Sequence, residues 1–246
     1  MPVAIRGSSS PLEAVGVVYR GQEPNDEYLG TCFALYFPRK CFLTAAHCIG
    51  DLPAHELFVV TQIWGQTESV VERVIKHPTA DLAILVLPPD SGVMARSFWG
   101  CAGYQLGEDF YAYGYPVDVL GENAKRPTAR LFKGHFQTFS KFRSLDGRYE
   151  YEAAELSIPC PAGLSGGPLF NMADQRFAIG MATENRDSRT TLDSWEEEQQ
   201  GSEVRKSIYQ EIIRYGVALL LKPLEPWLKS QIIEPYKTPV PKPSTE

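Results

Sequence analysis

A serine flanked by glycines is the strongest chemical signal in this sequence of 246 residues. The segment 161–170 reads PAGLSGGPLF, and Ser165 stands at its centre. Glycines around a serine let the backbone form a tight turn that exposes the hydroxyl and directs successive N–H groups to one point. Acyl transfer needs this geometry, because a carbonyl attacked by Ser165 develops negative charge that the N–H groups of Gly163 and Ser165 would stabilise. For this segment alone, a glycine-rich hairpin with an incidental serine is the alternative.

The serine needs a base, because a hydroxyl is a poor nucleophile until its proton is removed. Of the four histidines, His47 is the best candidate. It follows the apolar segment 42–46, whose small residues leave the imidazole free to face a cleft. The other three histidines lie among polar residues or before a proline. A histidine beside a strand is more often structural, so the case for His47 depends on Ser165.

The base in turn needs an acceptor that fixes its tautomer and stabilises the imidazolium formed during the reaction. Asp81 fits this role, because it begins the apolar run DLAILVL, where a carboxylate drawn inward is costly unless it accepts hydrogen bonds. A solvent-facing aspartate at the start of a strand is the alternative. The order His47, Asp81, Ser165 predicts a catalytic triad.

The elements that must position these residues are predicted to be short strands. From residue 14 onward, apolar segments alternate with turn residues, a rhythm typical of closed antiparallel sheets. Residues 224–233 are helix-like, with Pro226 tolerated in a first turn. We expect an N-terminal extension at 1–13, a first β-barrel lobe at 14–95, a second lobe with a C-terminal helix at 96–233, and a Pro-rich tail at 234–246.

Residues 184–214 interrupt this pattern with many charged side chains. Val204, Ile208 and Ile212, at four-residue spacing, predict an amphipathic helix after an acidic loop. We therefore predict a helical insertion near 185–214 that could act as a lid or bind a regulatory protein partner. A solvated surface excursion is the alternative.

Composition excludes several classes of protein. Twenty-four basic and thirty acidic side chains give a formal net charge of −6, so no overall positive field attracts nucleic acid. The N-terminal residues lack the basic start and apolar run of a secretory signal, so we expect a cytoplasmic protein. No apolar run is long enough to cross a bilayer, so we expect no membrane partner.

The five cysteines point to neither a metal nor a full set of disulfides. An odd number cannot all pair within the chain, and a reducing compartment favours free thiols. Their spacing shows no CxxC pair and no companion histidine of the kind that binds zinc. We therefore expect no metal and no organic cofactor.

Three segments of the sequence resemble the motifs of trypsin-like serine peptidases. The resemblance covers roughly residues 14–230 and implies an all-β fold of two six-stranded antiparallel Greek-key β-barrels, with the active site between them and a C-terminal helix. It also implies a disulfide between Cys32 and Cys48, which the expected cytoplasmic location leaves open. The three segments are TAAHC at 44–48, DLAIL at 81–85 and GLSGGPL at 163–169.

Departures from the family pattern narrow this interpretation. Leu164 replaces the aspartate that precedes the serine in secreted members, so the resemblance is closer to bacterial intracellular and heat-stress members. Pro159 stands where trypsin has the aspartate that binds basic side chains, so a strict Arg or Lys preference is not expected. By the same resemblance, Ala182, Thr183 and Glu184 form one wall of the substrate pocket, and we expect a small or medium apolar preference.

The sequence thus predicts a regulated intracellular serine endopeptidase that cleaves protein or peptide substrates through an acyl-enzyme. His47 would act as general base and then general acid, Asp81 would orient it, and Ser165 would attack. Gly163 and Ser165 would donate the oxyanion-hole N–H groups. Two alternatives stay open: a catalytically silent, protease-like binding module, and an esterase that uses the same triad.

Overall fold

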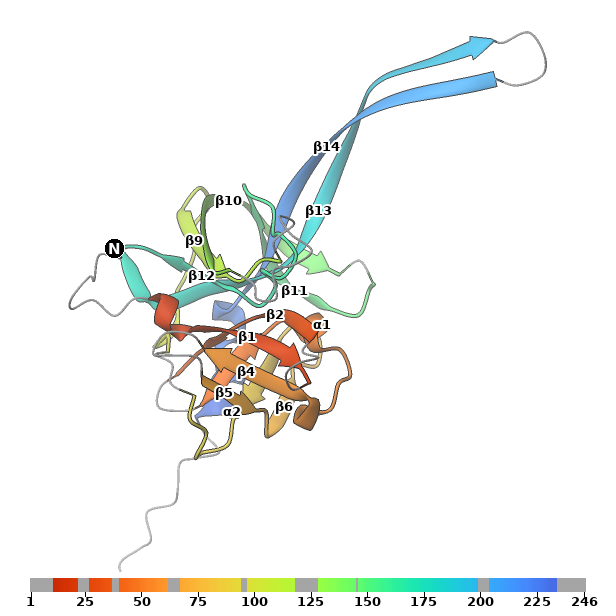
Figure 1. Ribbon diagram of the computed structural model, residues 1–246. Helices are drawn as coiled ribbons and strands as arrows, with labels where there is room; N and C mark the ends of the chain where they lie inside the picture. The colour runs from red at the N-terminus through yellow and green to blue at the C-terminus, as the bar shows by residue number, and fades with distance from the viewer. Residues whose placement is uncertain are drawn as a thin grey trace, which may run out of the picture.

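The computed structural model describes residues 11–21, 27–36, 40–61, 67–93, 97–117, 128–144, 146–198 and 204–233. Most of the predicted N-terminal extension and the whole Pro-rich tail lie outside these residues. Two groups of strands lie one above the other, and a long ribbon of two strands leaves the upper group (Figure 1).

The first group is a seven-stranded antiparallel sheet in the order β5-β4-β1-β2-β3-β7-β6. Its two end strands are separated in the chain only by Val71 and Glu72, whose N–H groups donate to Leu57 of β4 and Val86 of β7. Counted as one bent strand, β5 and β6 therefore close a six-stranded barrel. The strands are β1 Val15–Arg20, β2 Glu27–Ala34, β3 Cys41–Thr44, β4 Leu57–Thr61, β5 Thr67–Val70, β6 Arg73–Lys76 and β7 Ala83–Val86.

The second group has the order β12-β9-β10-β11-β14-β13-β8, and a further pairing of β12 with β13 closes six of its strands into a ring. The seventh strand, β8, pairs in parallel with β13. The predicted all-β fold of two barrels is confirmed. The strands are β8 Gly100–Cys101, β9 Asp109–Gly114, β10 Arg130–Arg143, β11 Glu150–Leu156, β12 Pro168–Asn171, β13 Asp174–Glu198 and β14 Val204–Leu220.

Aromatic side chains join the two barrels. Phe98, in the connection between them, packs edge-on against Phe33 of β2, with ring centroids 5.6 Å apart. On its other side it contacts Phe170 of β12 at 6.0 Å. All three rings are buried, so the core runs from one barrel into the other and holds the site between them.

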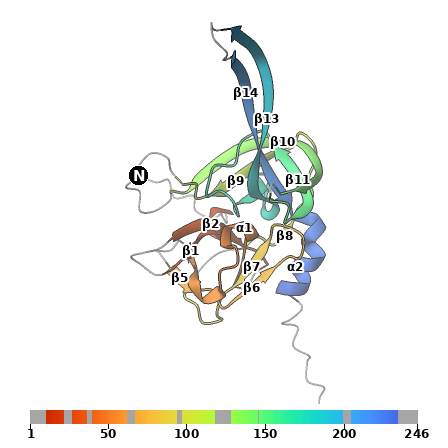
Figure 2. The ribbon, with the colours of Figure 1, turned by 90° about the vertical axis from the view of Figure 1, so that its right-hand side faces the viewer.

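The predicted C-terminal helix is confirmed as α2, Glu225–Ile232, with Pro226 in its first turn. Leu228 and Ile232 are fully buried, and the Trp227 ring meets His77 of the first barrel at 4.7 Å. The helix follows the last strand of the second barrel but lies beside β6 and β7 of the first (Figure 2). The other short helical segments are η1 Pro11–Ala14, α1 Ala46–Ile49, η2 Ala54–Glu56 and η3 Lys222–Leu224.

The predicted helical insertion near 185–214 is wrong, because this region is a β-ribbon. β13 and β14 pair from Gly180↔Leu220 out to Glu198↔Val204, with register irregularities after Ala182 and after Thr191. A four-residue spacing of apolar residues keeps them on one side of a strand as well as of a helix, since four is a multiple of two. Both strands continue strands of the barrel sheet, because β13 leaves that sheet at its end and β14 enters it at its end. The ribbon projects far from both barrels (Figures 1 and 2).

Candidate active site

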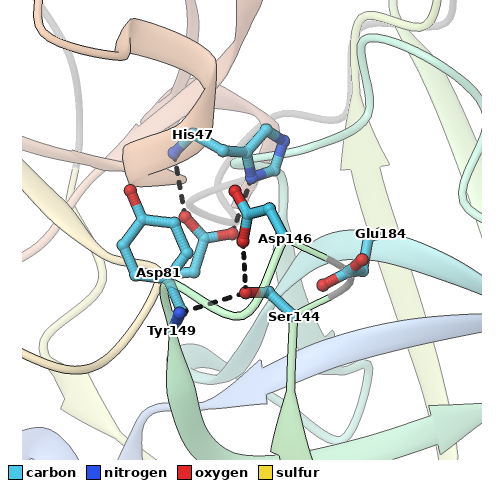
Figure 3. A pocket seen from close by; sticks show the side chains of 6 residues that line it. All are labelled: His47, Asp81, Ser144, Asp146, Tyr149 and Glu184. Atoms are coloured by element: carbon cyan, nitrogen blue, oxygen red, sulfur yellow. Dashed lines mark hydrogen bonds and ion pairs between the residues drawn. The ribbon is translucent and has the colours of Figure 1, made fainter.

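Neighbouring strands of the first barrel bring His47 and Asp81 together. β3 and β7 are antiparallel, with Thr44 opposite Ala83, so the residues just after β3 and just before β7 emerge at the same end. His47 lies in the short helix α1, and its Nδ1 is 2.6 Å from Asp81 Oδ2. The His47 backbone N–H donates to Asp81 Oδ1 at 2.9 Å. Figure 3 shows both contacts.

The environment of this pair favours a charged couple. Asp81 is only 1% exposed, and its carboxylate uses both oxygens to accept hydrogen bonds from His47, so the cost of its burial is offset. Burial by itself would lower the pKa of His47. Hydrogen bonds to Asp81 and Cys48, with the negative charge of the aspartate, outweigh burial and raise that pKa above its ordinary value of 6.5.

The serine comes from the second barrel, on the loop between β11 and β12. Two glycines of this loop have left-handed backbone, with φ of +85° at Gly163 and +88° at Gly166. At Gly166 an added Cβ would lie 1.9 Å from the carbonyl oxygen of Thr31. Only glycine fits there, because the loop passes directly against β2 of the first barrel.

Strand β2 holds the serine loop by its backbone. The Thr31 N–H donates to the Ser165 carbonyl at 3.0 Å. The Thr31 hydroxyl donates to the Gly163 carbonyl at 2.8 Å, and the Tyr28 hydroxyl donates to the same oxygen at 2.7 Å. The first barrel therefore carries the predicted base, and it also fixes the loop that carries the predicted nucleophile.

The Ser165 hydroxyl does not face His47. It donates a hydrogen bond to the Thr183 carbonyl of β13 at 2.5 Å. Within the described residues, no hydrogen bond joins it to His47. The two residues are nevertheless close, because Cys48 Sγ lies 3.6 Å from His47 Nε2 and 3.8 Å from the Ser165 carbonyl oxygen.

The predicted oxyanion-hole donors are available. In the part of the chain that the structure describes, the N–H groups of Gly163 and Ser165 donate to no acceptor. The neighbouring N–H groups are used, since Leu164 donates to Pro161 at 3.0 Å, Gly166 donates to Ala182 at 2.9 Å and Gly167 donates to Leu164 at 2.8 Å. Two backbone donors, two residues apart, are thus left for a developing negative charge.

The four residues predicted to line the substrate pocket have different surroundings. Pro159 is exposed, whereas Ala182 is fully buried in a hydrophobic cluster of the second barrel. The Thr183 side chain is also buried, and its hydroxyl donates to the Val217 carbonyl at 3.0 Å. Only Glu184 lines a cavity with the histidine.

That cavity has a volume of about 220 Å³ and is lined by His47, Asp81, Glu184 and three residues of the β10–β11 loop, Ser144, Asp146 and Tyr149. Figure 3 shows the side chains of these six residues, with Ser144 directed toward Asp146 and the Tyr149 backbone N. The Ser144 hydroxyl donates to Asp146, and the Arg148 N–H adds a second bond, so the pKa of Asp146 is lowered well below its usual value. The cavity beside the histidine therefore carries an ionised carboxylate.

Sequence reasoning missed the residues that hold and surround the site. Tyr28 and Thr31 lie more than 130 residues from Gly163, whose carbonyl they bind. No local pattern marks them, because their role depends on how the two barrels meet. The β10–β11 loop gives one weak signal, a serine and an aspartate two residues apart that can form a local turn.

No metal site is apparent among the described residues, which contain no group of three potential ligands. The five cysteines are free thiols, including Cys32 and Cys48. In the described part of the chain, no helix is long and apolar enough to cross a membrane.

The fold and the motifs together define a trypsin-like peptidase. The family model of the trypsin-like peptidase domain matches residues 30–181, more than half of the chain. The protein therefore belongs to this family of proteases, whose substrates are proteins or peptides.

Solved structures show the same fold. The apo protease domain of MamO from Magnetospirillum magneticum has a TM-score of 0.59 at 17% identity, covering 87% of this chain and 95% of that one. The inactive form of the M. tuberculosis protease Rv3671c has a TM-score of 0.54 at 16% identity, covering 90% of each chain. No curated protein sequence matches this chain.

Proposed function

We propose that the protein is a serine endopeptidase that cleaves peptide bonds through an acyl-enzyme formed on Ser165. The observation that carries this proposal is the bonded His47–Asp81 pair, next to a glycine-rich serine loop with two available N–H donors. A base, its orienting carboxylate, a nucleophile and oxyanion donors are the groups that acyl transfer requires.

The reaction begins when the Ser165 hydroxyl leaves Thr183 and turns to His47 Nε2. His47 takes the hydroxyl proton as Oγ bonds to the scissile carbonyl carbon, and the N–H groups of Gly163 and Ser165 stabilise the oxyanion. The C–N bond then breaks, and His47 gives its proton to the leaving amine. Water attacks the resulting ester by the same steps, which frees the acid and restores Ser165.

The hydrogen bond between Ser165 and Thr183 supports a resting state in which the nucleophile is withheld from its base. An active state requires the hydroxyl to leave the Thr183 carbonyl and to face His47. Such a resting state fits an enzyme whose activity is regulated, and it is also what a silent binding module would show. Labelling of Ser165 would favour the enzyme, and labelling that appears only when a partner is added would favour a regulated enzyme over a silent module.

The test is labelling of the purified protein with a fluorophosphonate probe, followed by peptide mapping. The expected result is modification at Ser165 in the wild type and none in Ser165→Ala. An unlabelled wild type would point to a latent enzyme that awaits a partner or to a binding module, and labelling would then be repeated with candidate partners added. Turnover of matched ester and peptide substrates then separates an endopeptidase from an esterase, since an esterase should cleave the ester and leave the peptide intact.

We further propose that the β13–β14 ribbon binds a regulatory protein partner. In the described structure, its outer part pairs only within itself, and a two-stranded hairpin is marginally stable alone in water. Near its base, Ile212 and Ile213 are 53% and 42% exposed. Because adjacent residues of a strand face opposite sides, each face of the ribbon presents an apolar group there.

This proposal is tested with a shortened ribbon. Replacing residues 189–212 by Asn-Gly joins Ser188 to Ile213, which are direct partners in the ladder, through a turn that suits hairpins. A partner that changes Ser165 labelling in the wild type should have no effect on this variant. An equal response of both proteins would remove the ribbon from the regulation.

A further inference from the structure

Asn185 bonds to both polar groups of one backbone residue. Its Oδ1 accepts the Cys160 N–H at 2.7 Å, and its Nδ2 donates to the Cys160 carbonyl at 2.7 Å. The side-chain amide thus pairs with Cys160 as the backbone of a neighbouring strand would. Asn185 belongs to β13, at the point where the ribbon begins.

The residue opposite Asn185 holds the same segment. Gly216 of β14 pairs with Asn185 and is the first residue of β14, in chain order, that also pairs with β11, through Leu156. Its N–H donates to the Ile158 carbonyl at 2.9 Å. A Cβ on Gly216 would lie 2.5 Å from that oxygen and 2.8 Å from Cys160 Sγ, so the two backbones touch.

The segment held in this way leads directly into the serine loop. Cys160 is followed by Pro161, whose carbonyl accepts the Leu164 N–H and so shapes the turn that contains Gly163. At the other end of the loop, the Gly166 N–H donates to the Ala182 carbonyl at 2.9 Å. Residues 182–185 of β13 therefore fix the loop at both ends.

We propose that Asn185 is a positioning residue for the serine loop, fixing Cys160 and thereby placing the N–H groups of Gly163 and Ser165 and the serine hydroxyl. This inference rests on the proposed function, because it concerns the same nucleophile. The same contact would allow a movement of the ribbon to change the position of the serine loop. Any partner that moves the base of the ribbon displaces Asn185, and with it the segment before the serine.

The test compares Asn185→Ala with a matched control, Asn171→Ala. Asn171 lies at the end of β12, where its Nδ2 donates to Glu108 at 2.6 Å and its Oδ1 accepts the Ala173 N–H at 2.7 Å. Each variant loses two hydrogen bonds in the same barrel, so their melting temperatures should fall by similar amounts. Only Asn185→Ala should label Ser165 more slowly, by about tenfold.

The effect should fall on one kinetic constant. Loss of positioning lowers the maximal rate of fluorophosphonate labelling and leaves the concentration for half-maximal rate unchanged, because the probe still reaches the site. A labelling rate equal to that of the wild type in Asn185→Ala would overturn the proposal. An equal slowing in Asn171→Ala would overturn it too, since general destabilisation would then explain both.

Amide hydrogen exchange separates this inference from the proposed function. Asn185→Ala should speed exchange across residues 158–167, whereas Asn171→Ala should leave that segment unchanged. If the wild type resists labelling even with candidate partners added, the proposed enzyme activity fails, but faster exchange in Asn185→Ala still supports the positioning role. Unchanged exchange in Asn185→Ala would contradict it, whatever the labelling shows.

Discussion

The histidine–aspartate half of the site and its serine half are held by contacts of different range. His47 and Asp81 leave the same end of two adjacent strands, and one pair of hydrogen bonds completes their arrangement. The serine loop depends on β2 of the other barrel and on β13. The first barrel alone therefore assembles the histidine–aspartate half. The position of the serine half depends on the contact between the two barrels.

The largest expected effect comes from the locally built half. Asp81→Asn keeps the size of the side chain but presents an N–H₂ group where the imidazole needs an acceptor, which favours the wrong histidine tautomer. We expect the rate of peptide cleavage to fall about 10⁴-fold, with the melting temperature changed far less. Steady-state kinetics and thermal unfolding measure the two. A loss of less than tenfold would argue that Asp81 does not orient the base.

Gly166→Ala should disrupt the other half through stability. The new Cβ would meet the Thr31 carbonyl at 1.9 Å on backbone with φ of +88°, so the barrels must separate or the loop must move. We expect a loss of about 3 kcal/mol in unfolding free energy, together with loss of labelling at Ser165.

Gly107→Ala is the control for that substitution. Gly107 has a similar φ of +76°, but nothing lies within 4 Å of its added Cβ. It should lose only the cost of left-handed backbone, about 1 kcal/mol, in the same denaturant titration. Equal losses in both variants would mean that the contact with Thr31 is unimportant.

Thr31→Val tests the same interface by a smaller change. It removes the hydroxyl that donates to the Gly163 carbonyl and accepts the Tyr115 N–H at 3.0 Å, and it keeps the shape of the side chain. We expect a loss of about 2 kcal/mol and slower labelling. Thr61→Val, which removes a hydroxyl bonded to Thr67 in β5, should lower stability but leave labelling unchanged.

Changes of pH act on the histidine–aspartate half of the site, because the pKa of His47 is raised. Only neutral His47 can accept the serine proton, so the labelling rate should rise with pH through a midpoint above 6.5. The charged pair has the opposite effect on stability. Its contribution is fully present below pH 6.5 and is lost as pH rises through the raised pKa. In Asp81→Asn the midpoint should move to lower pH, because burial lowers the pKa of His47 and the aspartate that raises it is gone. An unchanged midpoint would assign the titration to another group.

The same division explains what the sequence could and could not predict. His47, Asp81 and Ser165 are marked by neighbouring residues whose types are dictated by local geometry, as are the glycines of the serine loop. Tyr28, Thr31 and Asn185 act on residues far away in the chain or across the barrel, and nothing beside them in the sequence indicates this. The direction of the Ser165 hydroxyl toward Thr183 is likewise a product of packing between β13 and the loop.

The ribbon shows the limit of periodicity. Its apolar spacing fits helix and strand equally, and the deciding fact is that β13 and β14 are continuations of barrel strands already paired at Gly180 and Leu220. Two strands that are already paired in the barrel can extend their pairing into the ribbon one residue pair at a time. A helix there would have to end the ladder and begin a new nucleus.

The smallest expected effect follows from this continuity. The variant that replaces residues 189–212 by Asn-Gly keeps the pairing of Asn185 with Gly216 and the two hydrogen bonds from Asn185 to Cys160. The melting temperature should therefore change by less than about 2 °C. Basal labelling of Ser165 should equal that of the wild type, whereas the single substitution Asn185→Ala slows it. If the large deletion slows labelling and the small substitution does not, the outer ribbon supports the serine loop directly, and the local hold assigned to Asn185 is wrong.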